Sequence, residues 1–154
     1  MESVSFEDMR RAMVDSQLRT SGVNEAWVLT AMGSLPRENF VAASQRETAY
    51  MDRSITLEDG TVLNPPVSTA LLLQAADVAA ADNVLLVGAK DGYVAALLQG
   101  QVAKLTCVDA ADLTTAAKSA PYSLIVIDGA AEELPASLLA LAKDGARLVT
   151  GLSE

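Results

Sequence analysis

Four short apolar runs in the second part of the chain constrain its fold more than any other feature. They lie at residues 84–87, 105–108, 124–127 and 147–150. Three of the runs have few polar interruptions, which is typical of strands buried on both faces of a sheet. Helical stretches lie between them, at residues 91–99, 112–119 and 132–142. Alternating strands and helices predict an α/β fold with a parallel sheet and crossover helices.

The first sixty residues differ, because their apolar residues recur at helical spacing. Helices are expected at residues 6–18, 24–32, 37–50 and, after two prolines, 67–80. Ser5 and Asp8 predict a cap for the first helix, Ser21-Gly22 a stop, and Asn24 a cap for the next. A small hairpin is expected around the Asp59-Gly60 turn.

We expect residues 1–154 to form one domain. Its helical N-terminal part would cover residues 1–60, and its sheet-forming part residues 61–154. A short parallel sheet leaves an open edge, which favours pairing with another chain. A homodimer, or coverage of that edge by the N-terminal helices, is therefore expected.

Composition excludes several classes of function. The chain has no histidine and one cysteine, Cys107, so His-dependent catalysis, internal disulfides and Cys-cluster zinc sites are excluded. The net charge of −9 argues against a nucleic-acid partner. No apolar run is long enough to span a membrane, and the amphipathic start does not resemble a signal peptide. We therefore expect a cytoplasmic protein with no metal, nucleic-acid or membrane partner.

Three segments are candidates for a ligand site, because ligands of open parallel sheets bind beyond the carboxyl ends of the strands. The first is the loop from Gly88 to Gly92, which leads into a helix and lets the backbone approach a ligand. The second is Asp109, placed where such folds hold ribose hydroxyls. The third is Asp128. Each also has a purely structural interpretation, as a turn glycine, a helix cap or a solvated acid.

Beyond these segments, the order of motifs along nearly the whole chain resembles the protein-L-isoaspartate O-methyltransferase family. The N-terminal stretches that carry the resemblance are MVDSQLR at 13–19, VLTAM at 28–32, LPRENFV at 35–41, Ala49-Tyr50, Asp52-Arg53, Asp59-Gly60 and the helix start at 66–73. The later ones are the loop ending in Gly92-Tyr93, PYSLIVI at 121–127 and DGARLV at 144–149. The N-terminal stretches are the more specific to the family.

The resemblance implies a Rossmann-like fold of S-adenosylmethionine-dependent methyltransferases, with a reduced parallel sheet and an N-terminal helical region. It implies methyl transfer from S-adenosylmethionine to isoaspartyl carboxylates of damaged proteins, followed by collapse of the ester through a succinimide. Gly88, Lys90, Gly92, Asp109 and Asp128 would then hold the methyl donor. Asn64 would face the acceptor as the catalytic residue.

Several positions differ from the family pattern and mark a divergent, shortened member with a degenerate cofactor motif. Leu86 stands where the family usually has an acid, and Lys90 replaces the middle glycine of the loop. Asn64 replaces a serine or threonine. Twelve residues separate Asp109 from Tyr122, where the family normally has a helix and a third strand. Two alternatives stay open: a non-catalytic module acting through self-association or a protein partner, and a piece of a longer protein.

Overall fold

The computed structural model describes residues 5–109, 114–130 and 136–151. The chain folds into two compact units, Met1–Gln74 and Ala75–Glu154, and each is described by itself. The boundary between them lies after the predicted change of pattern near residue 60. The expectation of one domain over residues 1–154 stays a prediction.

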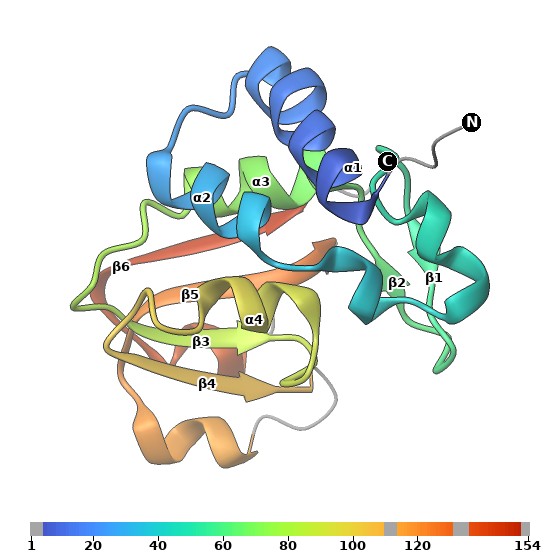
Figure 1. Ribbon diagram of the computed structural model, residues 1–154. Coiled ribbons are helices and arrows are strands. Elements are labelled where there is room, and N and C mark those ends of the chain that lie inside the picture. The colour runs from blue at the N-terminus through green and yellow to red at the C-terminus, as the bar shows by residue number, and fades with distance from the viewer. Residues whose placement is uncertain (1–4, 110–113, 131–135, 152–154) are drawn as a thin grey trace, which may run out of the picture. The chain divides into compact units, whose positions relative to one another are not determined.

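The first unit is mostly helical, as predicted. Its helical elements are α1 (Phe6–Met13), the π-helical turn η1 (Val14–Leu18), the 3-10 turn η2 (Arg19–Ser21), α2 (Ala26–Ser34), the 3-10 helices η3 (Arg37–Phe40) and η4 (Ala43–Thr48), and α3 (Pro66–Ala75). The strands β1 (Ile55–Thr56) and β2 (Val62–Leu63) pair antiparallel, which confirms the predicted hairpin (Figure 1).

Local sequence signals explain most of the helix ends in this unit. The Ser5 hydroxyl accepts a hydrogen bond from the Asp8 amide at 3.1 Å and caps α1, as predicted. Gly22 has a φ of 94° and stops the first helical stretch. The predicted cap at Asn24 was wrong, because Glu25 precedes α2 and makes no side-chain cap. The helix predicted to reach residue 80 ends at Ala75, since Asp77 adopts a φ of 50° that a helix does not allow.

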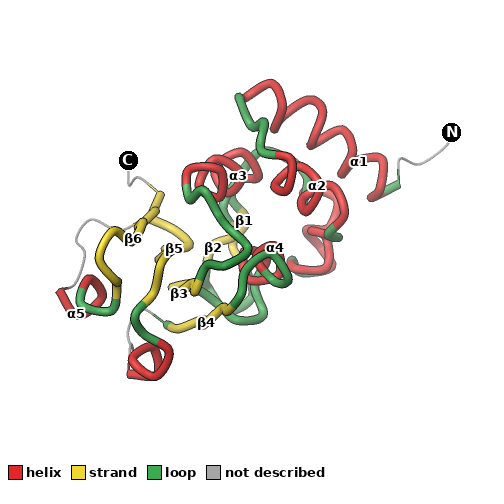
Figure 2. Tube along the Cα trace, turned by 90° about the vertical axis from the view of Figure 1, so that its left-hand side faces the viewer, coloured by secondary structure: helices red, strands yellow, loops and turns green. Residues whose placement is uncertain are grey.

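The second unit is built on a parallel sheet of four strands. Its elements are β3 (Asn83–Val87), α4 (Tyr93–Leu98), β4 (Lys104–Val108), the 3-10 helix η5 (Thr114–Ser119), β5 (Tyr122–Ala130), α5 (Ala136–Leu139) and β6 (Ala142–Gly151). The strand order is β4-β3-β5-β6, and every neighbouring pair is parallel. Figure 2 shows α4 on one side of the sheet and η5 and α5 on the other. The predicted parallel α/β sheet is therefore confirmed.

Several boundaries in this unit differ from the prediction. The helix predicted from Asp91 begins at Tyr93, because the Gly92 amide bonds the Ala89 carbonyl and the chain turns first. The last strand begins at Ala142, ahead of the apolar run at 147–150. The described part of the helix predicted at 112–119 is a 3-10 helix. The described part of the helix predicted at 132–142 is helical only in α5 and ends at Leu139, before β6 begins at Ala142. Residues 110–113 and 131–135 of these predictions lie outside the described residues.

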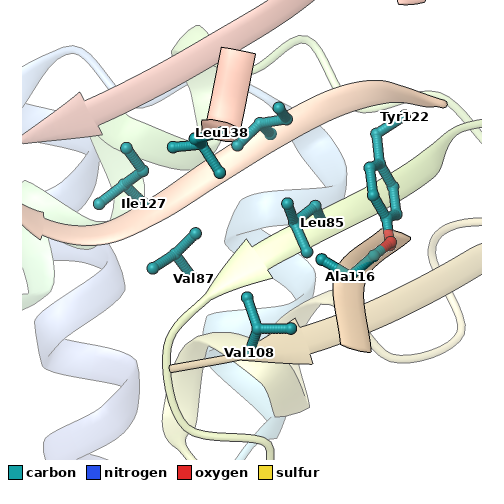
Figure 3. Packing of buried hydrophobic residues seen from close by; sticks show 8 residues of the cluster. Leu85, Val87, Val108, Ala116, Tyr122, Ile127 and Leu138 are labelled. Carbon is teal, nitrogen blue, oxygen red and sulfur yellow. The ribbon is translucent and has the colours of Figure 1, made fainter. Parts of the chain in front are cut away.

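The core of the second unit fills both faces of the sheet. On one face, side chains of β3, β4 and β5 pack against η5 and α5 (Figure 3): Leu85, Val87, Val108, Ala116, Tyr122, Ile125, Ile127 and Leu138. Because strand side chains alternate, Val84 and Leu86 point to the other face, and both are fully buried. Burial of each large aliphatic side chain contributes about 1.5–3 kcal/mol. Burial on two faces explains the nearly continuous apolar runs of the sequence.

A buried polar network ties the amino ends of β3 and β5 to the middle of β6, where Arg147 pairs with Leu124 near the start of β5. Asp82, 5% exposed, accepts hydrogen bonds from the Ser123 hydroxyl at 2.7 Å and the Ala79 amide at 2.8 Å. Arg147 of β6 forms an ion pair with Asp82 at 2.5 Å and bonds the Ala76 carbonyl at 2.8 Å. The Ser123 hydroxyl in turn accepts from the Asn83 amide at 2.9 Å. Since these contacts lie opposite the carboxyl ends of the strands, they serve the sheet rather than a ligand site.

Candidate functional site

The carboxyl ends of β3 and β4 stand in register with Ile127 of β5, which continues past the predicted end of its run to Ala130, so Asp128 lies within the strand and not in a loop after it. Val87, the last residue of β3, pairs with Val108 of β4 on one side and with Ile127 of β5 on the other. The residues that follow them are Gly88, Asp109 and Asp128. Because the strands are parallel, these three candidate residues lie side by side along one edge of the sheet. The Gly88 amide also donates to the Val108 carbonyl at 2.9 Å.

The direction of strand order reverses at this edge. The chain leaves β3 and forms β4 on one side of it, then crosses to form β5 on the other side. Loops that leave neighbouring strands in opposite directions create the usual ligand position of open α/β sheets. Gly88 and Asp128 flank that switch point, so the two residues stand where such folds bind ligands.

Gly88 allows Asp128 to approach the backbone of β3 closely. A Cβ atom placed on Gly88 would lie 3.0 Å from the Asp128 Cβ and 3.5 Å from its Oδ2. Real Cβ atoms essentially never come closer than 3.0 Å, so a side chain here would press on Asp128. Gly92 is restricted in the same way, since its added Cβ would lie 3.1 Å from the Ala89 carbonyl oxygen. The φ of Gly92 is −84°, which any residue can adopt, so it is the close packing against Ala89 that requires glycine at this position.

Lys90 and Asp91 expose their side chains at the tip of the loop. Asp77 is the non-glycine residue with positive φ among those the structure describes, so Lys90 sits in the loop without backbone strain. Burial raises the pKa of the Cys107 thiol on β4, and the negative charge of Asp91 raises it further. Among the described residues of this edge, the side chains at 91, 109 and 128 are acidic and the side chain at 90 is basic.

Leu86, at the position where the family pattern has an acid, belongs to the core. Its side chain is fully buried, and its Cγ would lie 3.6 Å from a Cβ placed on Gly88. The Leu86 side chain therefore packs in the core close to Gly88 at the start of the loop. In this chain the acidic groups of the edge come from the ends of the strands and the loop, not from position 86.

Asn64 belongs to the first unit, whereas the other five predicted site residues belong to the second. It is half-buried in the segment between β2 and α3. Its backbone carbonyl accepts a hydrogen bond from Arg37 Nη2 at 2.8 Å. This contact of Asn64 lies within the first unit.

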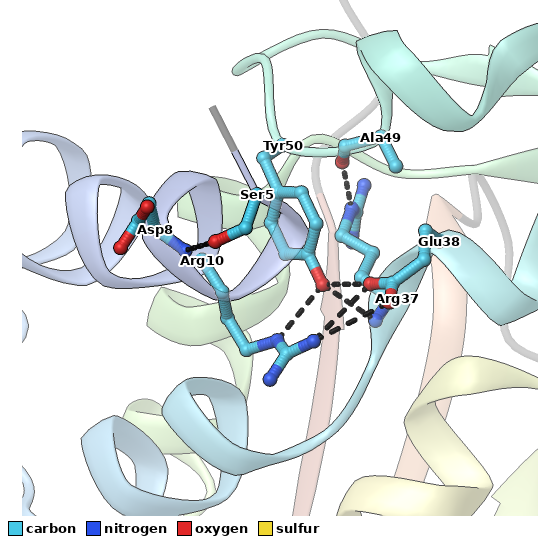
Figure 4. A network of polar contacts seen from close by, with 7 residues as sticks. All are labelled: Ser5, Asp8, Arg10, Arg37, Glu38, Ala49 and Tyr50. Carbon is cyan, nitrogen blue, oxygen red and sulfur yellow. Dashed lines mark hydrogen bonds and ion pairs between the residues drawn. The ribbon is translucent and has the colours of Figure 1, made fainter. Parts of the chain in front are cut away.

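Sequence reasoning missed the polar cluster to which Arg37, the partner of the Asn64 carbonyl, belongs (Figure 4). Arg37 is fully buried, and its amide donates to the Tyr50 hydroxyl at 3.0 Å. Tyr50 donates to Glu38, which also pairs with Arg10 at 3.3 Å. Burial alone would raise the pKa of Glu38, but the bonds from Tyr50 and Arg10 lower it overall. A charged residue in a short polar stretch gives no local signal of burial, so these contacts could not be predicted.

Within residues 5–109, 114–130 and 136–151, no group of three or more His, Cys, Asp or Glu side chains is arranged to bind a metal ion. Among the helices of the described residues, none combines the length and apolar character needed to cross a membrane.

Residues 9–114 match the model of the protein-L-isoaspartate(D-aspartate) O-methyltransferase family. Among curated proteins, the chain is 32% identical over 165 residues to the protein-L-isoaspartate O-methyltransferase of Koribacter versatilis, with 91% of this chain and 74% of that protein covered. It is 36% identical over 117 residues to the one of Roseiflexus castenholzii, with 76% and 53% covered.

Two solved structures share the fold. One, named as a protein-L-isoaspartate O-methyltransferase of Plasmodium falciparum in complex with S-adenosyl-L-homocysteine, superposes with a TM-score of 0.76 at 14% identity and covers 94% of this chain and 84% of that one. The other bears the same enzyme name, with a TM-score of 0.69, 18% identity and 94% and 54% coverage. The chain thus spans about half the length of two of these four relatives. The fold is that of Rossmann-like methyltransferases, as predicted.

Proposed function

Because the chain belongs to the protein-L-isoaspartate O-methyltransferase family, we propose that it transfers a methyl group from S-adenosylmethionine to the α-carboxylate of isoaspartyl residues in proteins or peptides. The observation that carries the proposal is the alignment of Gly88, Asp109 and Asp128 at the switch point of the sheet. The relatives are named for this activity, which favours the enzyme over a non-catalytic module.

The residues at the switch point fit the methyl donor. Gly88 and Gly92 bring no side chain to the loop, but the atoms that their Cβ would meet belong to Asp128 and Ala89, so the fit to the donor depends on the polar side chains of the edge. We assign Asp109, exposed just after β4, to the ribose hydroxyls of the donor, where acids of such folds accept hydrogen bonds. We assign Lys90, exposed in the loop, to the donor's carboxylate. When bound, the donor supplies an activated methyl group.

The acceptor needs orientation rather than a base. An α-carboxylate has a pKa of about 3.3–3.7, so it is ionised and nucleophilic at neutral pH. No proton has to be removed before the methyl group is transferred, which agrees with a chain that has no histidine. We assign Asn64 to the acceptor, because an amide side chain both donates and accepts hydrogen bonds. Alignment of the two reactants then supplies most of the rate enhancement.

The proposal extends to the setting of the reaction. Isoaspartyl-containing proteins are the partners, the location is the cytoplasm, and neither nucleic acid nor a membrane takes part. A homodimer stays a prediction from the open sheet edge, to be tested by sedimentation equilibrium.

Transfer of labelled methyl groups to a synthetic peptide tests the function. The protein should methylate a peptide with one isoaspartyl residue and leave the same peptide with ordinary aspartate unlabelled. Products should be separated at mildly acidic pH, because the ester is unstable in base. Asp109→Ala should weaken donor binding about tenfold or more, since a hydrogen bond to a charged group contributes about 1.5–3 kcal/mol. Ser44→Ala, at an exposed position in η4, is the control. Equal labelling of both peptides, or of neither, would contradict the proposal.

A further inference from the structure

The segment that carries Asn64 is held at both ends by side chains from elsewhere in the first unit. Arg37 Nη2 donates to the Asn64 carbonyl at 2.8 Å. Three residues later, the Val67 amide donates to Asp52 Oδ1 at 3.2 Å. The two contacts enclose Pro65, which with Asn64 connects β2 to α3, and Pro66, the first residue of α3.

These two anchors add to what the prolines between them supply, because the Pro65 carbonyl accepts a hydrogen bond from the Thr69 amide at 3.1 Å and Pro66 is buried. Proline has no amide hydrogen, so neither Pro65 nor Pro66 donates a backbone hydrogen bond. Their rings fix φ near −65° and make the segment stiff. A stiff segment moves as one piece, so its ends decide where it lies. Arg37 sets one end at Asn64, and Asp52 sets the other at Val67.

Arg37 joins this segment to a second one. It is fully buried, and its Nε donates to the Ala49 carbonyl at 2.5 Å while Nη2 reaches Asn64. Figure 4 shows Arg37 beside Ala49 and Tyr50, with its amide on the Tyr50 hydroxyl. A guanidinium presents its donors in a rigid plane, so it fixes two carbonyls relative to each other in a way that a lysine does not.

Such an arrangement gives precision at the expense of stability. A buried charge carries a large desolvation penalty, and well-packed apolar residues often stabilise a protein as much or more. Arg37 donates hydrogen bonds to two carbonyls that are remote from each other in sequence, those of Ala49 and Asn64. The geometry favours a role in fixing the position of Asn64.

We propose that Arg37 and Asp52 are positioning residues, which hold the backbone at Asn64 so that its side chain meets the acceptor carboxylate. The inference rests on the proposed function, because Asn64 acts there on the acceptor. Both residues act through Asn64, and the contacts that carry them lie within the first unit.

Steady-state kinetics of Arg37→Lys and Asp52→Ala test the inference, with the isoaspartyl peptide varied at saturating S-adenosylmethionine. Each variant should lower kcat/KM for the peptide about tenfold, because small misplacements of a reactive group have effects of this size or larger. The dissociation constant for S-adenosyl-L-homocysteine should stay unchanged. Arg53→Ala, an exposed neighbour of Asp52, should behave as the wild type.

A double-mutant cycle with Asn64→Ala separates positioning from general stability. If Arg37 and Asp52 act through Asn64, their substitution should have little further effect on kcat/KM once the Asn64 side chain is removed. An effect that is the same in both backgrounds would overturn the inference. Unchanged peptide kinetics in Asp52→Ala would overturn it as well. Because Asp52 is exposed and tolerates substitution, this variant remains available if Arg37→Lys does not fold. In these cases the proposed function stands. A wild-type protein that methylates no isoaspartyl peptide overturns both.

Discussion

At the scale of single residues, glycine at position 88 is required by the space that Asp128 occupies. Gly88→Ala should push Asp128 away, since the new Cβ would lie 3.0 Å from the Asp128 Cβ. We expect the free energy of unfolding to fall by about 1–3 kcal/mol, as for other overpacked sites. Affinity for S-adenosyl-L-homocysteine should fall as well. Urea denaturation and calorimetric titration measure the two effects.

Gly33→Ala is the matched control for this substitution. Gly33 lies exposed in α2, and a Cβ there would be an ordinary 3.6 Å from Val14 Cγ2. Alanine should leave stability unchanged or raise it by about 0.5–1 kcal/mol, because it restricts the unfolded chain. Equal stability of the two variants would show that Asp128 does not approach Gly88 as described.

At the scale of elements, β3 is a central strand with both faces buried, which determines what position 86 accepts. Leu86→Glu would restore the acid of the family pattern but place a carboxylate at a fully buried position. We expect a loss of about 2–5 kcal/mol in unfolding free energy, since a buried unpaired charge is strongly unfavourable. Leu86→Met should cost less than about 1.5 kcal/mol. Thermal denaturation measures the stability of both variants. A glutamate variant as stable as the methionine variant would contradict full burial of position 86.

The Asp82 network gives the sheet a dependence on pH. Burial alone would raise the pKa of Asp82, but the bonds from Ala79 and Ser123 and the charge of Arg147 lower it below the ordinary 3.8. A carboxyl with a lowered pKa in the folded state stabilises the protein above its unfolded pKa. That contribution is lost as the pH falls through the lower, folded value.

Asp82→Asn should therefore be less stable than the wild type at pH 7, by about 1–3 kcal/mol for the lost charged hydrogen bonds. The difference should begin to shrink below about pH 4, where the carboxyl of the unfolded chain becomes protonated, and should be lost as the pH falls through the lower pKa of the folded state. Urea denaturation between pH 7 and pH 3 measures it. Glu38, whose pKa is also lowered, is present in both proteins, so its effect cancels. A difference independent of pH would be at odds with an ionised, bonded Asp82.

At the scale of the whole molecule, donor binding should stabilise the folded chain. A ligand at about one hundred times its Kd adds about 2.7 kcal/mol, which raises Tm by several degrees for a chain of this size. S-adenosyl-L-homocysteine should produce this shift in the wild type and a smaller one in Asp109→Ala. Adenosine alone, which lacks the carboxylate assigned to Lys90, should shift Tm less. An unchanged Tm at millimolar ligand would contradict donor binding.

The strands could be predicted because their signal is local. Burial on both faces demands a continuous apolar run, and all four runs became parallel strands. Helix ends were predicted less well, since Asp77 and Gly92 end or delay a helix through turns whose geometry depends on neighbouring segments. Gly88, Asp109 and Asp128 were found for the same local reason, because each directly follows an apolar run of the sequence, although β5 itself continues past Asp128 to Ala130.

By itself, the sequence determined the alternation of strands and helices and the residues that end β3 and β4, because hydrophobic periodicity and turn residues act over a few positions. Only the tertiary structure decided that Val87 stands in register with Val108 and Ile127, so that Asp128 meets Gly88. It also decided that Arg37 reaches the Asn64 carbonyl. These contacts join residues far apart in sequence, and their formation depends on the path of the whole chain rather than on any local pattern.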